Sequence, residues 1–452
     1  MKKSFLLLGA AFTLGSSNSL ALSLNEIVGL KRTEYKSPQG ISEVCATPRK
    51  WAGANYTDSD AKKENTLCGY DFYATVGICP KYSSTNPGLM IIEPDEKFSK
   101  QAIDSSSCDL KKLGLKTDAK FKQSITCSYT PSILGYYHLS RILGDVGRVP
   151  VSVFRSIDIK THKAQTTKAV NSLRNSKLAI KDSWAMLEKV HANPQNYPNL
   201  VDRSGTQMFG ALSDNVRNEE QYVEVSGVGS YDTRYERFIK QRPYQIVSSS
   251  SSPQQLIGSN EFTRVAQTAL QMKDVSDMVI IDTLMNQQDR IGNIHYKFVW
   301  YTINPQSSTL ERFKSKAKIK DGKITIPAEE KTAMANRKAV LLKEMILKDN
   351  DCGVTKTNMM RKVSAIEGLK HVSYRTYANL LTFEQALAGA SAKDFFTKEL
   401  LFTEADYNLL KRNALFARQV LVKKCQSGEL KFDVDLEDYI PGATPVRKAC
   451  GS

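Results

Sequence analysis

Residues 262–293 read FTRVAQTALQMKDVSDMVIIDTLMNQQDRIGN, and this stretch decides the fold. Its apolar residues recur every three or four positions, which is the spacing of a helix with one buried face. That face comprises Phe262, Val265, Ala269, Met272, Val275 and Val279. The pattern predicts a helix that continues to about Met285. The polar residues after it, with Gly292 among them, predict a loop.

Downstream of this loop lie further strand signals, and the last of them is followed by a second aspartate, Asp349. Residues 294–303 carry alternating aromatic side chains and predict a strand. Residues 318–326 predict a hairpin that turns at Asp321-Gly322. The apolar segment 340–347 fits a strand or a helix by pattern alone, and it runs directly into Asp349-Asn350-Asp351. Phosphoryl transfer needs an aspartate that orients the acceptor hydroxyl, and oxygen ligands that hold a metal on the phosphates. The order helix, aspartate loop, strand and second aspartate therefore indicates phosphotransfer.

The upstream half contains a helix signal and several strand signals. Thr130 caps a helix with Pro131 in its first turn, and Gly144 ends it. Residues 149–154 alternate as a strand, and residues 75–93 predict short strands broken by prolines. The spans 163–195 and 382–424 have helical character, and the serines at 248–252 predict a loop.

Three stretches resemble the secretory-pathway kinase family, which includes the Golgi casein kinase and four-jointed. They are DMVIIDTLMNQQDR at 277–290, YYHLSRILG at 136–144 followed by Val149-Pro150, and LKDN at 347–350. They occur in the family's order between about residues 87 and 353. The aspartate loop is also similar to those of phosphatidylinositol kinases and spore-coat kinases, which widens the class of expected substrates.

By this resemblance the chain is identified as a distant, bacterial-type member of the family. The resemblance implies an α+β, atypical protein-kinase-like fold with two lobes, stabilised by disulfides. Carried over by position, it makes Asp289 the catalytic aspartate and Asp349 a metal ligand. Asn293 and Asp351 are further candidate ligands for Mg²⁺ or Mn²⁺, and ATP or another nucleotide is the expected donor. Arg290 is expected to orient the loop by pairing its planar guanidinium with a carboxylate.

The chain departs from the family at the lysine that anchors ATP. The best local match, LMIIEP at 89–94, has Glu93 at the lysine position, so Lys81 and Lys97 are the candidate substitutes for nucleotide binding. The helix glutamate that should pair with the lysine falls near Ser132 or Ile133, and no Gly-rich phosphate loop is evident. A pseudokinase that binds nucleotide or a partner without turnover is therefore the second reading.

The N-terminus predicts export. Lys2 and Lys3 precede a short apolar run, and Ser19-Leu20-Ala21 fits a cleavage site, so residues 1–21 are expected to be a signal peptide. The mature protein is then expected to be periplasmic or secreted. We expect an irregular N-terminal segment at 22–74, an N-lobe-like part at 75–160 and a helical C-lobe-like part at 161–452 with the catalytic and metal loops. No later stretch is long and apolar enough to span a membrane as a helix.

Eight cysteines favour disulfides in an exported chain, and five of them precede residue 130. Eight cysteines allow 105 connectivities, so the pairing stays open. The formal net charge of +16 favours acidic proteins or phosphate-bearing small molecules as partners. The basic residues are dispersed and no nucleic-acid-binding motif occurs, so specific nucleic-acid binding is not expected. A third reading is a non-enzymatic exported protein whose basic face binds acidic surfaces.

Overall fold

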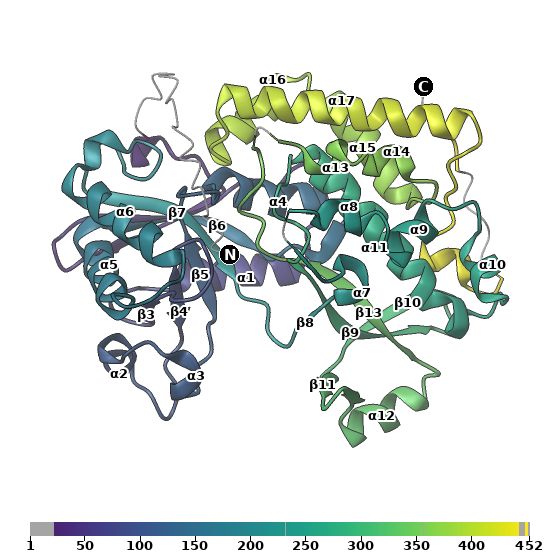
Figure 1. The fold of residues 1–452 in the computed structure, drawn as a ribbon, viewed down its shortest axis with the longest axis horizontal. Coiled ribbons are helices and arrows are strands. Elements are labelled where there is room, and N and C mark those ends of the chain that lie inside the picture. Colours follow the sequence, from purple (N-terminus) through teal and green to yellow (C-terminus); the bar gives the residue numbers. More distant parts are fainter. Residues whose placement is uncertain (1–21, 231, 356, 443–447, 451–452) are drawn as a thin grey trace, which may run out of the picture.

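The computed structural model describes residues 22–230, 232–355, 357–442 and 448–450. The expected signal peptide, residues 1–21, lies outside the described residues. The described chain folds into a lobe built around a large sheet and a lobe rich in helices, which lie side by side in Figure 1. A segment after residue 214 connects the two lobes.

The first lobe is organised by a seven-stranded sheet in which every neighbouring pair is antiparallel. In their order across the sheet, the strands are β1 (Lys31–Lys36), β2 (Ser42–Thr47), β6 (Ser152–Asp158), β7 (Gln207–Asp214), β5 (Ala119–Lys122), β4 (Leu89–Ile92) and β3 (Gly77–Pro80). Strands β3 and β4 form a hairpin, and β5 lies beside β4 although 26 residues separate them in the chain.

Six helices surround this sheet. They are α1 (Asp58–Gly69), α2 (Lys100–Ser105), α3 (Leu110–Leu113), α4 (Thr130–Ile142), α5 (Ile159–Ser172) and α6 (Ile180–Ala192). Helices α5 and α6 pack against each other, and α5 also contacts the sheet. Helix α4 is entirely buried, because it packs on the sheet and also reaches the second lobe. Pro131 lies in its first turn, as the sequence predicts.

The second lobe is built around α11 (Phe262–Leu284), which is buried along most of its length. Its short neighbours on the N-terminal side are α7 (Val223–Ser226), α8 (Arg234–Phe238), α9 (Arg242–Val247) and α10 (Pro253–Ile257). The later helices are α12 (Ala328–Ala335), α13 (Met359–Lys362), α14 (Ala365–Gly368), α15 (Tyr374–Ala386), α16 (Ala390–Asp394) and α17 (Glu404–Gln426). Helix α17 packs on α11 and α15 and runs along the top of the lobe in Figure 1.

A smaller sheet in the second lobe brings the two aspartate loops together. It has the order β10 (Leu310–Lys314), β9 (Ile294–Ile303) and β13 (Val340–Leu347), and β8 (Glu220–Gln221) pairs with the start of β9. Ile294 at the start of β9 pairs with Leu347 at the end of β13. Antiparallel pairing therefore places the loop before β9 beside the loop after β13. The segment 340–347, ambiguous by pattern, is a strand because it pairs with β9 along its whole length.

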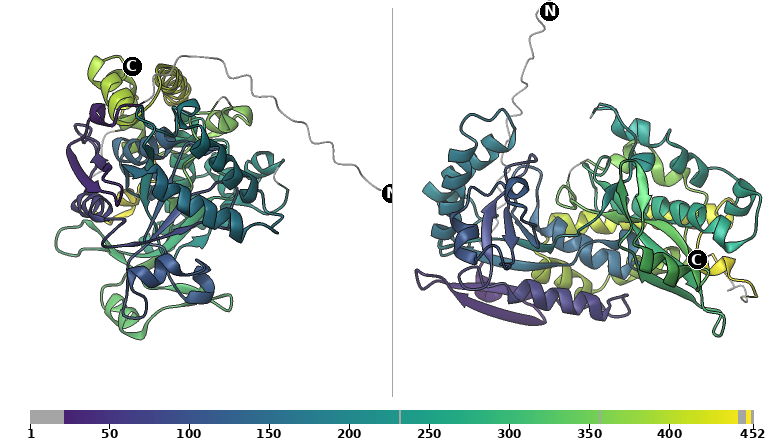
Figure 2. Two further views of the ribbon diagram at one scale, coloured as in Figure 1. Left: turned by 90° about the vertical axis from the view of Figure 1, so that its left-hand side faces the viewer. Right: turned by 90° about the horizontal axis from the view of Figure 1, so that it is seen from below.

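The predicted hairpin at 318–326 is present as β11 (Lys318–Lys320) and β12 (Lys323–Thr325). It lies with α12 in a projection away from the second lobe, which Figure 2 shows from two further sides. The predicted strand at 294–303 coincides with β9. The loop at 248–252 separates α9 from α10.

Four disulfides pair all eight cysteines. Three close short segments: Cys45–Cys68, Cys79–Cys108 and Cys425–Cys450. The fourth joins Cys127 before α4 to Cys352 after β13, and so links the two lobes covalently. A chain of this size gains stability from each bridge mainly because the unfolded state is restricted.

The N-terminal part is more ordered than the sequence indicates. Residues 22–74 hold β1, β2 and α1 instead of an irregular segment, and the first lobe runs from β1 to the end of β7 at Asp214. The expected boundaries at 74/75 and 160/161 therefore do not coincide with the lobes. The helices α5 and α6, placed in the C-lobe-like part by sequence, belong to the first lobe.

The architecture is the expected α+β fold of two lobes with disulfides. In protein kinases a loop covers the phosphates, a lysine lies on the third strand, and a helix follows. Here the β3–β4 hairpin, β5 and α4 follow one another in that order. None of the described helices has the length and apolarity required to cross a membrane.

Candidate active site

A cleft of about 550 Å³ lies where the two lobes meet. Four of the candidate residues from the sequence line it: Asp289, Asn293, Asp349 and Asp351. From the first lobe come Lys122 and the β3–β4 loop, and from the second lobe come the segment 226–230 and Arg234. The cleft therefore collects acidic, basic and amide side chains from both lobes.

Asp289 is held by the loop that follows α11. Asn286 ends the helix in a left-handed conformation that asparagine tolerates. The Arg234 guanidinium donates to Asp289 Oδ1 at 2.6 Å and to the carbonyl oxygen of Gln288 at 2.7 Å, so it fixes both the carboxylate and its loop. Asn293 Nδ2 donates to the Asp289 carbonyl oxygen at 2.7 Å. The Asp289 carboxylate remains 26 % exposed and faces the cleft.

Asp349 and Asp351 share one counterion from the opposite lobe. Lys122 Nζ lies 2.8 Å from Asp349 Oδ1 and 2.9 Å from Asp351 Oδ2. Lys122 is the last residue of β5, and its side chain is 10 % exposed. Asn86 Nδ2 also donates to Asp351 Oδ2, at 3.3 Å. The second-lobe aspartates thus form an ion-paired cluster with a lysine of the first lobe.

The electrostatics of this cluster favour charged groups. The Lys122 ammonium holds the pKa of the Asp349 carboxyl well below its usual range despite burial, and Lys120 and Lys81 act in the same direction. Burial opposes the charge on Lys122, but the two carboxylates outweigh it and raise the pKa of Lys122. Burial and the nearby Lys122 lower the pKa of Lys81 to about 8. The metal-binding candidate Asp349 is therefore ionised at neutral pH.

Lys122 lines the candidate site although it was not predicted from the sequence. It ends β5, the strand that follows the β3–β4 hairpin. Glu93, which stands at the lysine position in the local sequence match, is exposed just after β4. Lys81 begins the β3–β4 loop and is half-buried, and Lys97 is exposed. Neither of them lines the cleft. The alternation Ala119-Lys120-Phe121-Lys122 shortly before the Pro131 helix is the signal that points to this strand. Thr130, predicted to cap that helix, is its first residue, and its N-cap is Tyr129, which forms no side-chain cap.

The β3–β4 loop and helix α4 bring hydroxyl and amide groups to the site. Ser84, Thr85 and Asn86 of the β3–β4 loop line the cleft, where kinases carry a Gly-rich loop. No glutamate occurs on α4, so the usual lysine–glutamate pair is absent from the described site. Instead Ser132 Oγ donates to the Asn350 carbonyl oxygen at 2.6 Å and accepts from the Gly353 amide at 3.0 Å. The helix is therefore bonded directly to the loop after β13.

Arg290 links the loop that carries Asp289 to the loop that carries Asp349 through buried hydrogen bonds. Its guanidinium donates to both carboxylate oxygens of Asp282, at 2.8 and 3.1 Å, as the planar fork predicts. It also donates to the Lys348 carbonyl oxygen at 2.8 Å and to Asn350 Oδ1 at 2.6 Å. Arg290 is fully buried and does not line the cleft, so it acts by fixing the loops.

We expect Arg290→Met to lower the free energy of unfolding by about 3–5 kcal/mol, because it leaves the buried Asp282 carboxylate without its cation, bonded to the neutral Tyr136 hydroxyl. Arg290→Lys restores the charge but not the fork, so it recovers only part of the loss. Chemical denaturation measures both. Arg375→Met is the control, since Arg375 and Glu437 form a surface pair at 3.6 Å worth at most about 1 kcal/mol. Equal losses for Arg290→Met and Arg375→Met would contradict this linking role.

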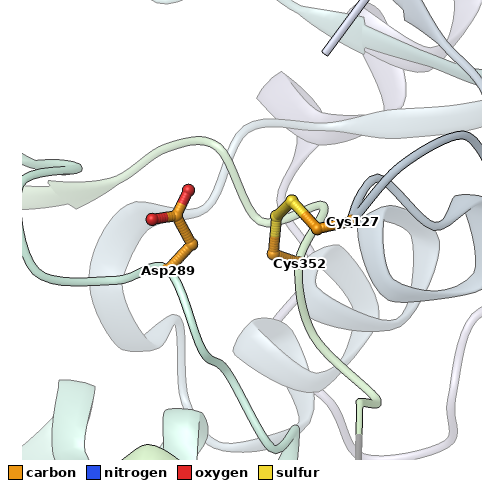
Figure 3. A group of neighbouring side chains, drawn as sticks. All are labelled: Cys127, Asp289 and Cys352. Carbon is orange, nitrogen blue, oxygen red and sulfur yellow. A yellow bond between two sulfur atoms is a disulfide. The ribbon is translucent and has the colours of Figure 1, made fainter. Parts of the chain in front are cut away.

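The oxygen donors fit a hard divalent cation. The carboxylates of Asp349 and Asp351 and the amide oxygen of Asn293 line the same cleft, and Asn293 Nδ2 is already engaged by a carbonyl. Mg²⁺ and Mn²⁺ prefer such ligands. The sulfurs of Cys127 and Cys352 lie within 4.8 Å of a carboxylate oxygen of Asp289. Figure 3 shows the three side chains and the disulfide. The two sulfurs are joined to each other and are not available as thiolate ligands.

No family model and no curated protein matches the chain. Among solved structures, it is similar to the crystal structure of the Golgi casein kinase with Mn/ADP bound, with 10 % identity and a TM-score of 0.43. That alignment covers 81 % of this chain and 76 % of the other. A further crystal structure of the Golgi casein kinase aligns at 11 % identity with a TM-score of 0.42, over 90 % and 87 % of the two chains. Both likenesses concern the fold at most and assign this chain no activity.

Proposed function

We propose that this chain is an exported, metal-dependent kinase-like phosphotransferase that acts on a hydroxyl group of a protein or a small molecule. The observation that carries the proposal is the ion pair of Lys122 with Asp349 in the cleft that also holds Asp289. These three residue types, from two lobes and three loops or strands, are those that phosphoryl transfer requires. They converge although 227 positions separate Lys122 from Asp349.

Each residue has a role that follows from its place. Asp289 accepts or orients the proton of the acceptor hydroxyl, and Arg234 holds its carboxylate in position. Asp349 and Asn293 hold Mg²⁺ or Mn²⁺, with Asp351 as a further ligand. The bound metal neutralises charge on the transferred phosphoryl group. Lys122 and the hydroxyl and amide groups of the β3–β4 loop bind phosphate oxygens of ATP or another donor.

The test is phosphate transfer by the oxidised mature protein with labelled ATP and Mg²⁺ or Mn²⁺, offered acidic proteins and polyols as acceptors. We expect Asp289→Asn and Asp349→Asn each to lower transfer by about 10²- to 10⁴-fold, since each removes one chemical role. Asp321→Asn, in the β11–β12 turn, is the matched control and should keep full activity. Transfer that survives in both site variants would refute the proposal.

The missing glutamate on α4 favours a second candidate, a pseudokinase that binds nucleotide without turnover. Nucleotide-dependent thermal stabilisation with no label transfer over many acceptors would select it, because ligand binding to the native state raises apparent stability. Neither binding nor transfer would select a non-enzymatic exported protein that binds acidic surfaces. We place the mature protein in the periplasm or outside the cell, an environment in which four disulfides are stable.

A further inference from the structure

A second, smaller compartment lies behind Lys122. It shares Lys122 and Asp349 with the main cleft, and it alone of the two is lined by Asp214 and Asn215, where the chain leaves the first lobe. A donor whose phosphates contact Lys122 from the main cleft would direct the rest of the molecule into this compartment. Its shape and lining therefore decide which part of the donor is recognised.

The compartment is too small for a nucleobase. Its volume of about 50 Å³ is several-fold below the roughly 300–1,000 Å³ of pockets that hold organic ligands. Ile133 and Pro150 are the apolar side chains of its lining. The remaining lining is Lys120, Lys122, Ser152, Ser213, Asp214, Asn215, Lys348, Asp349 and Asn350.

Lys120 is the residue that limits which group the compartment can accept. It precedes Lys122 by two residues, so both side chains lie on the same face of β5. Protein kinases carry a small alanine two residues before the strand lysine. Here a long cationic side chain lines the compartment at that place. Lys120 thus excludes a base and presents an ammonium group to anions instead.

The other groups on the donor side also suit phosphate oxygens. Ser84, Thr85 and Asn86 of the β3–β4 loop supply hydroxyl and amide donors. Burial lowers the pKa of Lys120. A phosphate oxygen beside its amine would favour the charged ammonium form. In the described lining of both compartments no aromatic side chain is available to stack on a base. Together with Lys120 and Lys122, these groups can bind oxyanions, beside the carboxylates of Asp349 and Asp351 that would hold the metal.

We propose that the site recognises its donor through a metal-bound oligophosphate chain, and that it accepts inorganic tripolyphosphate as well as any nucleoside triphosphate. This inference rests on the proposed function. The acceptor oxygen forms a bond to the terminal phosphorus, and the bond from that phosphorus to its bridging oxygen breaks. The hydroxyl proton passes by way of Asp289 to the leaving pyrophosphate, so that ROH and P₃O₁₀⁵⁻ give ROPO₃²⁻ and HP₂O₇³⁻. No oxidant or further reactant is needed.

The first test compares dissociation constants of ATP, GTP, CTP and inorganic tripolyphosphate for the oxidised protein with Mn²⁺, by calorimetry. We expect all four values to agree within about tenfold, because the base contributes no contact of its own. Adenosine should not bind. An ATP affinity more than about tenfold above that of GTP, CTP or tripolyphosphate would overturn the proposal. Measurable binding of adenosine, which carries no phosphate, would also overturn the proposal.

A variant tests the residue that carries the inference. We expect Lys120→Met to weaken ATP and tripolyphosphate alike, by about tenfold, since it removes one charge-assisted contact to phosphate. Lys320→Met, at an exposed lysine of β11, is the matched control and should change neither. A loss confined to ATP would mean that Lys120 contacts the base, against the proposal. Folding of each variant is checked by its melting temperature.

The outcomes separate this inference from the function on which it rests. Label transfer from ATP that depends on Asp289, with no binding of tripolyphosphate, leaves the phosphotransferase standing and removes the inference. Tight binding of tripolyphosphate without any transfer keeps the oligophosphate site and selects the pseudokinase. The absence of both binding and transfer would refute the oligophosphate site and the proposed phosphotransferase together.

Discussion

Lys122→Met is expected to lower phosphoryl transfer by at least about 100-fold, the cost of losing one preorganised group that stabilises transferring charge. The same substitution should tighten Mn²⁺ binding in the absence of nucleotide by about tenfold or more. Lys122 neutralises Asp349 and Asp351 at 2.8 and 2.9 Å. Its removal leaves two carboxylates that attract a cation more strongly, since a unit charge about 4 Å away is worth roughly 1–4 kcal/mol in a partly hydrated site.

The opposite signs of these two effects distinguish an active-site lysine from a merely structural one. We also expect Lys122→Met to lower the free energy of unfolding by about 3–5 kcal/mol, because it leaves Asp351 buried without its cation, and we expect Mn²⁺ to restore part of that loss. Calorimetric titration with Mn²⁺ and denaturant unfolding measure both quantities. Unchanged or weaker Mn²⁺ binding would contradict the pairing.

Two control variants sharpen the measurement. Lys122→Arg keeps the charge, so stability and Mn²⁺ affinity should remain near those of the parent while transfer falls, because the guanidinium does not reproduce the point contact of an ammonium. Lys97→Met removes an exposed lysine that lies outside the cleft. It should leave transfer unchanged. A loss of transfer in Lys97→Met would restore Lys97 as a nucleotide-binding residue.

The second-lobe side of the candidate site could be predicted from the sequence because its signals are local. The apolar periodicity of 262–279 and the alternation of 294–303 define α11 and β9, and each coincides with the element in the structure. Once β13 is a strand beside β9, the two aspartates must meet at one end of the sheet. The order of the motifs along the chain carries this information, and the pairing of β13 with β9 completes it.

The lysine could not be placed in the same way, because it depends on how the sheet is paired. The match at 89–94 belongs to β4, and Lys122 lies on the neighbouring β5. An insertion that holds α2 and α3 separates these strands by 26 residues in the chain, yet hydrogen bonding returns them to adjacent positions. A motif read along the chain follows the first strand and misses the second.

The N-terminal elements and the disulfide pairing were hidden for related reasons. Strand β1 is exposed or half-exposed along its length, so it shows no apolar alternation. Helix α1 carries few apolar residues and depends on the capping box of Thr57 and Asp60. The pairing of Cys127 with Cys352 spans 225 residues, and only the closure of the two lobes brings them together. Sequence spacing contains no signal for such a contact.

The inter-lobe disulfide gives the second large expected effect. We expect Cys127→Ser/Cys352→Ser to lower the free energy of unfolding by about 5 kcal/mol, the loop-closure value for 225 residues. We also expect it to weaken Mn²⁺–ATP binding severely. The bond joins the segment before α4 to the loop that carries Asp349 and Asp351, and Asn86 Nδ2 lies 3.4 Å from Cys127 Sγ and 3.3 Å from Asp351 Oδ2.

The chain offers a matched control in Cys425–Cys450, which closes 25 residues at the end of α17 and takes no part in the cleft. Cys425→Ser/Cys450→Ser should cost about 3.5 kcal/mol by the same relation, and it should leave nucleotide affinity intact. Denaturant unfolding gives the stabilities, and calorimetry with Mn²⁺–ATP gives the affinities. The comparison separates a general loss of stability from a specific loss of the site.

The physical reason for a specific loss is that the cleft is assembled from both lobes. Lys122 and the β3–β4 loop come from the first lobe, whereas Asp289 and Asp349 come from the second. With the bond intact, the two halves stay within contact distance even when the ion pairs open transiently. Without it, each opening lets the lobes separate about the connecting segment, and binding must then include the cost of bringing them back together. Equal affinities in the two serine double variants, at temperatures where both are folded, would show that the ion pairs and the Ser132 hydrogen bonds alone hold the site.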